Sequence, residues 1–84
     1  MSEPKWIRFV KLPNEQYKTD RWDILTVDGG FTIGRVSWST GWRRYVFRPG
    51  EHSEWEQDCL HDVAAFLEKE TKDYKWRRSL NKKT

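Results

Sequence analysis

The chain has 84 residues, with six tryptophans, three tyrosines, four phenylalanines and a formal net charge of +3. This length allows one small domain, whose thin core depends on aromatic rings for much of its buried area. The single cysteine, Cys59, excludes an intramolecular disulfide and a cysteine-based metal site. There is no signal-peptide pattern and no long apolar run, which predicts a soluble cytoplasmic protein with no membrane partner.

Charge is segregated along the chain. Residues 1–50 carry a net charge of +4, residues 51–71 carry −6, and residues 72–84 carry +5. The pattern indicates a basic sheet region, an acidic helix and a basic tail. It is typical either of an ordinary solvated surface with internal charge complementarity or of a binding footprint.

The first element expected is a strand over residues 6–12, which are rich in β-forming side chains and end at Pro13. Residues 13–20 are polar and turn-prone, and they predict a loop. Alternatively, the first twenty residues form a loosely docked arm.

A hairpin is expected next. The β-rich run at residues 22–27 is followed by Asp28-Gly29 and by a second β-rich run that begins at Gly30. In the second run, alternation places Phe31 and Ile33 on the opposite face from Val36 and Trp38. A bulge at Gly34-Arg35 would return all four to one face, and otherwise the centre of the sheet is apolar on both faces.

Ser39-Thr40-Gly41 predicts a second turn, and residues 42–48 predict the last strand. Its alternation puts Tyr45 and Phe47 on one face, expected under the helix. The opposite face of this strand carries Trp42, Arg44, Val46 and Arg48.

A capped amphipathic helix is expected from Glu54 onward. Ser53 and Glu56 have the spacing of a capping box, in which each side chain bonds the other's backbone amide. The apolar stripe that follows is typical of core packing, and it comprises Cys59, Leu60, Val63, Ala64, Phe66, Leu67 and Tyr74. Residues 75–84 show neither periodicity nor a cap, which predicts a flexible tail.

These elements predict an α+β fold. We expect a small antiparallel β-meander of three strands, plus a possible N-terminal fourth, with one C-terminal α-helix packed across one face. Residues 1–74 would form a single β-β-β-β-α domain, and residues 75–84 a flexible basic tail.

The sequence contains no catalytic pattern. His52 and His61 lack the spacing of a metal-binding motif, and Cys59 and His61 face away from each other on a helix. Gly29-Gly30 is a hairpin turn, because no helix follows it as a phosphate loop requires. We therefore expect no enzyme, no metal, no cofactor and no small-molecule substrate.

The candidate binding residues form a basic-aromatic set, which comprises Arg35, Trp38, Trp42, Arg43, Arg44 and Arg48. Arginines interleaved with aromatic rings are typical of proteins that bind single-stranded nucleic acid or RNA, whose bases stack on the rings. A sheet can alternatively enter the DNA major groove with arginines toward the base edges. The competing interpretation is structural, with tryptophans in the core and arginine stems packed over them.

Two resemblances accompany these residues. Residues 22–72 resemble, in topology, the plant Apetala2-type DNA-binding domain and the arm-binding domains of phage integrases, which read DNA with the sheet face opposite the helix. The resemblance implies that Arg35, Arg44 and Arg48 contact DNA. A second resemblance, within residues 34–72, is to a group of small phage and prophage proteins. It is carried by the runs W-R-R-Y-V-F-R-P and C-L-H-D-V-A-A-F, and it implies a phage or prophage setting.

The resulting hypothesis is a non-enzymatic phage or prophage module that binds nucleic acid, DNA or RNA, in a salt-sensitive manner. The alternative is an accessory protein that binds a host or phage protein through its tryptophan-arginine patch or its acidic helix.

Overall fold

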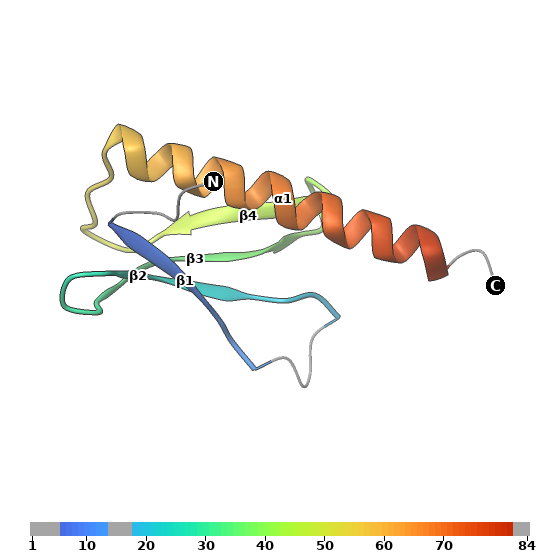
Figure 1. Ribbon diagram of the computed structural model, residues 1–84, viewed down its shortest axis with the longest axis horizontal. Coiled ribbons are helices and arrows are strands. Elements are labelled where there is room, and N and C mark those ends of the chain that lie inside the picture. Colours follow the sequence, from blue (N-terminus) through green and yellow to red (C-terminus); the bar gives the residue numbers. More distant parts are fainter. Residues whose placement is uncertain (1–5, 14–17, 82–84) are drawn as a thin grey trace.

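The computed structural model describes residues 6–13 and 18–81, and its elements form two layers (Figure 1). Strands β1 (Ile7–Lys11), β2 (Trp22–Thr26), β3 (Thr32–Ser39) and β4 (Arg44–Pro49) precede helix α1 (Gln57–Asn81). The strands form one antiparallel sheet in the order β1-β2-β3-β4, and α1 lies across one face of it. The predicted α+β meander with one C-terminal helix is confirmed, and its possible N-terminal strand is β1, paired with β2. Within the expected loop at 13–20, residues 14–17 lie outside the described part.

The predicted hairpin connects β2 to β3, but its loop is longer than the Asp-Gly pair alone. Thr26 closes the loop: its backbone N–H donates to the carbonyl of Phe31 at 2.8 Å, and its carbonyl accepts from Gly30 at 3.2 Å. Gly29 and Gly30 have φ angles of 93° and 69°. These left-handed conformations favour glycine, which explains the Gly-Gly pair.

A register shift lies one residue before the predicted bulge. Ile24 pairs with Gly34 and Leu25 with Thr32, so Ile33 has no partner on β2. The shift leaves Val36 on the helix side of the sheet, fully buried. Of the two alternatives for this strand, the one that returns Phe31 to this face does not hold, because Phe31 lies in the loop closed by Thr26 and is 69% exposed.

The core lies between the sheet and α1 and is built around an aromatic cluster. Its buried members are Ile7, Trp22, Ile24, Val36, Tyr45, Cys59 and Val63. The Trp22 ring meets Tyr45 edge-on at 5.3 Å between ring centroids and Phe66 edge-on at 5.1 Å. Phe66 in turn stacks flat on Phe9 of β1 at 3.9 Å. Tyr74 of α1 meets Tyr45 of β4 edge-on at 6.3 Å between ring centroids, which confirms the prediction that Tyr45 lies under the helix.

The helix begins three residues later than predicted, and its cap is a different residue. The backbone N–H of Cys59 donates to Oε1 of Glu56 at 2.6 Å, so Glu56 is the N-cap. Ser53 does not form the predicted capping box, because its amide and hydroxyl both donate to the carbonyl of Gly50. Its hydroxyl oxygen also accepts the indole N–H of Trp55 at 2.9 Å.

The Glu56 cap predicts an acid-sensitive contribution to stability. The hydrogen bond from the Cys59 amide lowers the pKa of Glu56 below its ordinary value of 4.5. The stabilisation is therefore complete above pH 4.5 and is lost as the pH falls through the lower folded-state pKa. Glu56→Ala should melt below the wild type at pH 7, and the two melting temperatures should converge as the pH falls through the lowered folded-state pKa of Glu56. Glu54→Ala, outside the helix, is the control, and a gap for Glu56→Ala that does not depend on pH would contradict this role.

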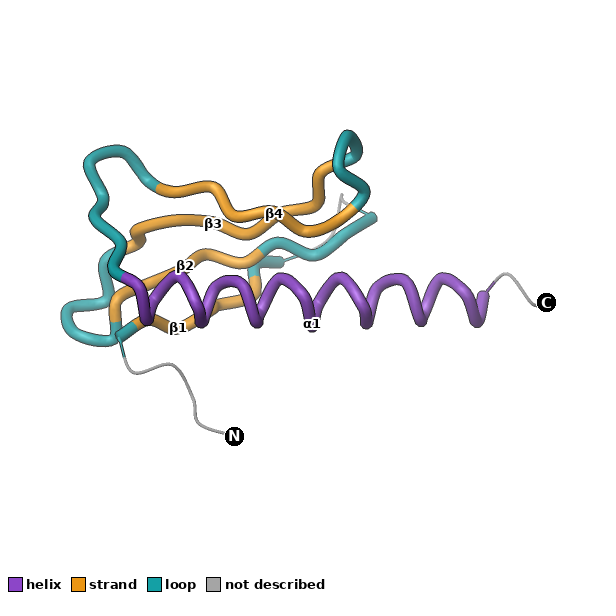
Figure 2. Tube along the Cα trace, turned by 90° about the horizontal axis from the view of Figure 1, so that it is seen from above, coloured by secondary structure: helices purple, strands orange, loops and turns teal. Residues whose placement is uncertain are grey.

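The helix also continues further than predicted. Residues 75–81, expected in a flexible tail, are the last turns of α1, while residues 82–84 lie outside the described part. At about 1.5 Å per residue its 25 residues span roughly 37 Å, against roughly 27 Å for the eight-residue strand β3. The C-terminal turns therefore project beyond the sheet (Figure 2). Leu60, expected in the core stripe, is 45% exposed, because Cys59 and Val63 face the sheet instead.

Candidate functional site

The sheet face away from α1, here called the open face, is rich in arginine. Strand alternation and register place on it Arg8, Val10, Asp23, Leu25, Thr32, Arg35, Ser37, Ser39, Arg44, Val46 and Arg48. It carries four arginines and one acidic residue. The three arginines that the topological resemblance singled out, Arg35, Arg44 and Arg48, thus share the face opposite the helix.

Hydrogen bonds hold two of these arginines in place. Arg35 Nε donates to Asp23 Oδ1 at 2.9 Å, and Arg48 Nε donates to Ser37 Oγ at 2.8 Å. Each bond uses one of the five N–H donors of its guanidinium group. Among the described residues, the remaining donors are left for a ligand. Arg35 and Arg48 are direct cross-strand partners, and like charges placed so destabilise a sheet. An anion bound over β3 and β4 would relieve this repulsion.

Arg44 lies where β4 meets the helix. It is exposed and also borders a shallow groove with Lys72 and Lys75 of α1. The neighbouring Tyr45 amide donates to Thr71 Oγ1 at 3.1 Å, which ties the edge of β4 to α1. This contact fixes the turn that precedes β4 beside the second half of the helix.

The six predicted site residues do not form one surface. Trp38 pairs with Tyr45 on the helix side of the sheet, and its ring lies 4.4 Å from that of Tyr74. Arg43 lies in the turn on that side, and Trp42 at the tip of the turn is 73% exposed. Trp38 therefore lies on the opposite side of the sheet from Arg35, Arg44 and Arg48, because it shares its side of β3 with the buried Val36.

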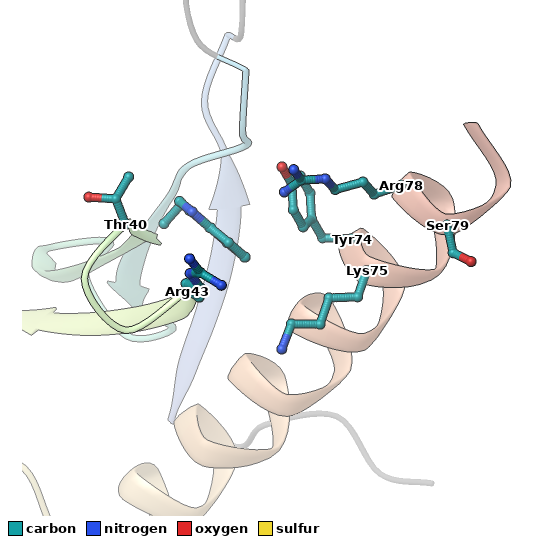
Figure 3. Close-up of a pocket in the computed structure, with 7 residues that line it drawn as sticks. Thr40, Arg43, Tyr74, Lys75, Arg78 and Ser79 are labelled. Carbon is teal, nitrogen blue, oxygen red and sulfur yellow. The ribbon is translucent and has the colours of Figure 1, made fainter. Parts of the chain in front are cut away.

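Trp38 and Arg43 instead border a second candidate site, the helix–turn hollow. It has a volume of about 650 Å³, and its lining comprises Trp38, Thr40, Arg43, Tyr74, Lys75, Arg78 and Ser79. Figure 3 shows Arg43 extending from the turn, and Tyr74, Lys75 and Arg78 from the helix, toward the space between them. The Arg43 amide donates to the Ser39 carbonyl at 2.7 Å, which closes the turn.

A smaller adjoining hollow extends this site. Its volume is about 630 Å³, and it shares Tyr74 and Arg78 with the first. It adds Lys18 and Arg77, together with one acid, Asp20. Burial raises the pKa of Tyr45, which also lines it, so that hydroxyl is neutral at physiological pH.

Sequence reasoning missed the helical cations at residues 75–78 because it ended the helix at Tyr74. Two signals pointed to them. The run from Gln57 to Asn81 contains neither glycine nor proline. Arg78 also follows Tyr74 by four residues, which continues the sheet-facing side of α1.

Other reactive groups are buried or dispersed. Burial raises the pKa of Cys59 to about 11, so the thiol is protonated at neutral pH and acts as a core side chain. Among residues 6–13 and 18–81, no three His, Cys, Asp or Glu side chains are grouped to hold a metal ion. In the same residues, no helix has the length and apolar character needed to cross a bilayer.

The chain is similar to a small phage protein. It is 25% identical over 63 residues to the uncharacterised 9.3 kDa protein of Acholeplasma phage L2, a match that covers 75% of this chain and 81% of that protein. No protein-family model matches the chain, and no solved structure matches it. The comparison supports the resemblance to small phage proteins, whereas the likeness to Apetala2-type domains remains a prediction.

Proposed function

We propose that the protein is a non-enzymatic, phage-derived module that binds double-stranded DNA through the open face of its sheet. The observation that carries the proposal is the position of Arg35, Arg44 and Arg48. Strand alternation places all three on the uncovered face of the β3–β4 hairpin, with Arg44 and Arg48 on the edge strand β4, where Arg44 also borders the helix-side groove. A two-stranded ribbon with strands about 4.8 Å apart fits a DNA major groove about 12 Å wide. There, arginines can donate to phosphates and to guanine edges.

Duplex is favoured over single-stranded nucleic acid by the absence of rings on the open face. Its described residues are arginines and small or aliphatic side chains with one acid, and none is aromatic. Proteins that bind single strands without sequence preference depend on aromatic rings for base stacking. Trp38, the one tryptophan of β3, lies on the other side of the sheet.

The charge distribution supports the same orientation. The segment that leads into α1 and forms its first half, residues 51–71, has a net charge of −6. The helix lies on the face opposite the open-face arginines (Figure 1). A charge separation of this kind turns the arginine face toward a polyanion during encounter and keeps the acidic helix away from it.

The test is binding of a fluorescently labelled duplex, followed by anisotropy over a range of salt concentrations. Arg44→Gln/Arg48→Gln should weaken binding by about tenfold to a hundredfold and reduce the slope of log K against log salt by about two. Both side chains are exposed, so folding should be retained and the thermal melt should stay cooperative. Lys69→Gln/Lys72→Gln on α1, away from the open face and with the same charge loss, is the matched control and should retain most of the affinity.

Equal losses for the two pairs would show non-specific attraction and contradict the assignment to the open face. Tighter binding of single-stranded than of double-stranded DNA would contradict the proposal that the ligand is a duplex. Absence of binding to any nucleic acid at low salt would remove the proposal. It would favour a protein partner for the exposed Trp42, Leu60, Trp76 and Leu80.

A further inference from the structure

Three cations from two separate elements converge on the helix–turn hollow. Arg43 comes from the β3–β4 turn, and Lys75 and Arg78 come from α1 (Figure 3). All three are exposed and form no ion pair in the described part of the chain, and no acidic residue lines this hollow. Like charges gathered without a counter-charge repel one another. The arrangement therefore favours an anion between them.

The backbone at Arg43 gives an independent indication. Its φ angle is 58°, in the left-handed region that glycine adopts without strain and that side-chain-bearing residues rarely adopt. Backbone geometry alone would favour glycine at this position. Arginine instead places a guanidinium at the mouth of the hollow in a backbone conformation that glycine would adopt without strain.

The wall of the hollow is aromatic. The rings of Trp38 and Tyr74 lie 4.4 Å apart and are half-buried, so part of each still faces the hollow. A flat heterocycle can pack on such a wall, and arginine adds a cation–π contribution. The volume of about 650 Å³ is within the range of small-molecule sites. The adjoining hollow, lined by Arg77 and Lys18 and by one acid, Asp20, leaves room for a chain of phosphates.

We propose that the helix–turn hollow binds a nucleoside phosphate. The base packs against Trp38 and Tyr74, and the phosphates accept hydrogen bonds from Arg43, Lys75 and Arg78. Aromatic wall and cations together favour this ligand class over inorganic phosphate, which has no ring, and over a neutral nucleoside, which has no charge. The site is independent of the duplex-binding proposal, because it lies on the other side of the sheet.

The test is an NMR titration of the ¹⁵N-labelled full chain with ATP, adenosine and inorganic phosphate at about 0.15 M salt. ATP should cause saturable shifts of the Trp38 indole N–H and of the Arg43 and Ser79 amides. Adenosine and phosphate should each bind at least about tenfold more weakly. No saturable shift with ATP, or shifts as large at Arg35 and Ser37 as in the hollow, would overturn the site.

Two variants separate specific contact from general attraction. Lys75→Gln/Arg78→Gln should weaken ATP binding by about tenfold or more. Lys69→Gln/Lys72→Gln, on the same helix and with the same loss of charge, should change it by less than about threefold. Equal losses in the two pairs would overturn the assignment.

Arg43→Gly tests the turn itself. Glycine removes the cation and relieves the backbone strain, so ATP binding should fall while the melting temperature stays the same or rises. Unchanged ATP binding would overturn the role of Arg43 as a ligand contact. A lower melting temperature would show that the side chain is structural, which would also contradict that role.

The same chemistry could come from a free nucleotide or from the phosphorylated end of a strand. A single-stranded oligonucleotide with a 5′-phosphate that binds more tightly than both its unphosphorylated form and ATP would identify the strand end. ATP that binds as tightly as the phosphorylated strand would identify the free nucleotide. Arg44→Gln/Arg48→Gln should leave ATP binding intact, so a failure of duplex binding and a failure of the hollow can be told apart.

Discussion

Trp22→Ala is expected to remove a large fraction of the protein's stability. Trp22 is 6% exposed and has edge contacts with both Tyr45 and Phe66, so its removal empties the centre of the aromatic cluster. Truncation of a buried tryptophan costs about 3–5 kcal/mol. A domain of this length has a total stability of roughly 4–13 kcal/mol, so the loss is a large fraction of the whole.

The measurement is urea unfolding followed by circular dichroism, with Trp42→Ala as the matched control. Trp42 is 73% exposed at the tip of the β3–β4 turn, and its contact with Ser39 Oγ uses the backbone amide, which alanine retains. The control should change the free energy of unfolding by less than about 0.5 kcal/mol. Similar losses for the two variants would show that Trp22 is not the centre of the core.

Gly34→Ala is expected to destabilise the fold by about 1–3 kcal/mol through overpacking. A Cβ atom at Gly34 would lie 2.9 Å from Phe47 Cε1, 3.1 Å from Trp55 Cζ2 and 3.2 Å from the Arg48 carbonyl oxygen. The Phe47 and Trp55 rings meet edge-on at 4.6 Å directly over this glycine. The absence of a side chain at Gly34 therefore lets the segment before α1 pack on the sheet.

A double-mutant cycle checks this explanation. Phe47→Leu removes the closest ring atoms, so the cost of Gly34→Ala should be smaller in that background than in the wild type. Gly41→Ala is the control, because a Cβ there has its nearest contact at 3.9 Å, with Ser39 Oγ. A full cost that persists in the Phe47→Leu background would assign the strain to the Trp55 ring or the Arg48 carbonyl instead.

Much of the fold could be predicted because its signals are local. The β2–β3 hairpin follows from two β-rich runs around Asp28-Gly29, and the strand order follows from short connections. The start of the helix could not be predicted as well. Ser53 and Glu56 have the spacing of a capping box, but Gly50 and Trp55 engage Ser53 through contacts that sequence spacing does not reveal.

The two candidate sites also differ in how far local sequence patterns could predict them. Alternation along the last strand was sufficient to separate Arg44 and Arg48 from Tyr45, and the structure keeps that separation. Predicting the helix–turn hollow would have required two facts that no local sequence pattern indicates. One is the side of the sheet on which Trp38 lies, which depends on the register shift at Ile33. The other is the continuation of α1 far enough to carry Arg78.

The single uninterrupted helix also makes α1 a lever between the core and the hollow. Phe66 rests on Phe9 and Trp22, whereas Ser79 lies at the edge of the hollow. The intervening 13 residues correspond to an arm of about 20 Å. A tilt of about 5° at Phe66 would displace Ser79 by about 2 Å, enough to make or break hydrogen bonds to a ligand. The hydrogen bond from Tyr45 to Thr71 and the contact of Tyr74 with Trp38 resist such a tilt, so one rigid helix holds both the packing at Phe9 and the shape of the hollow.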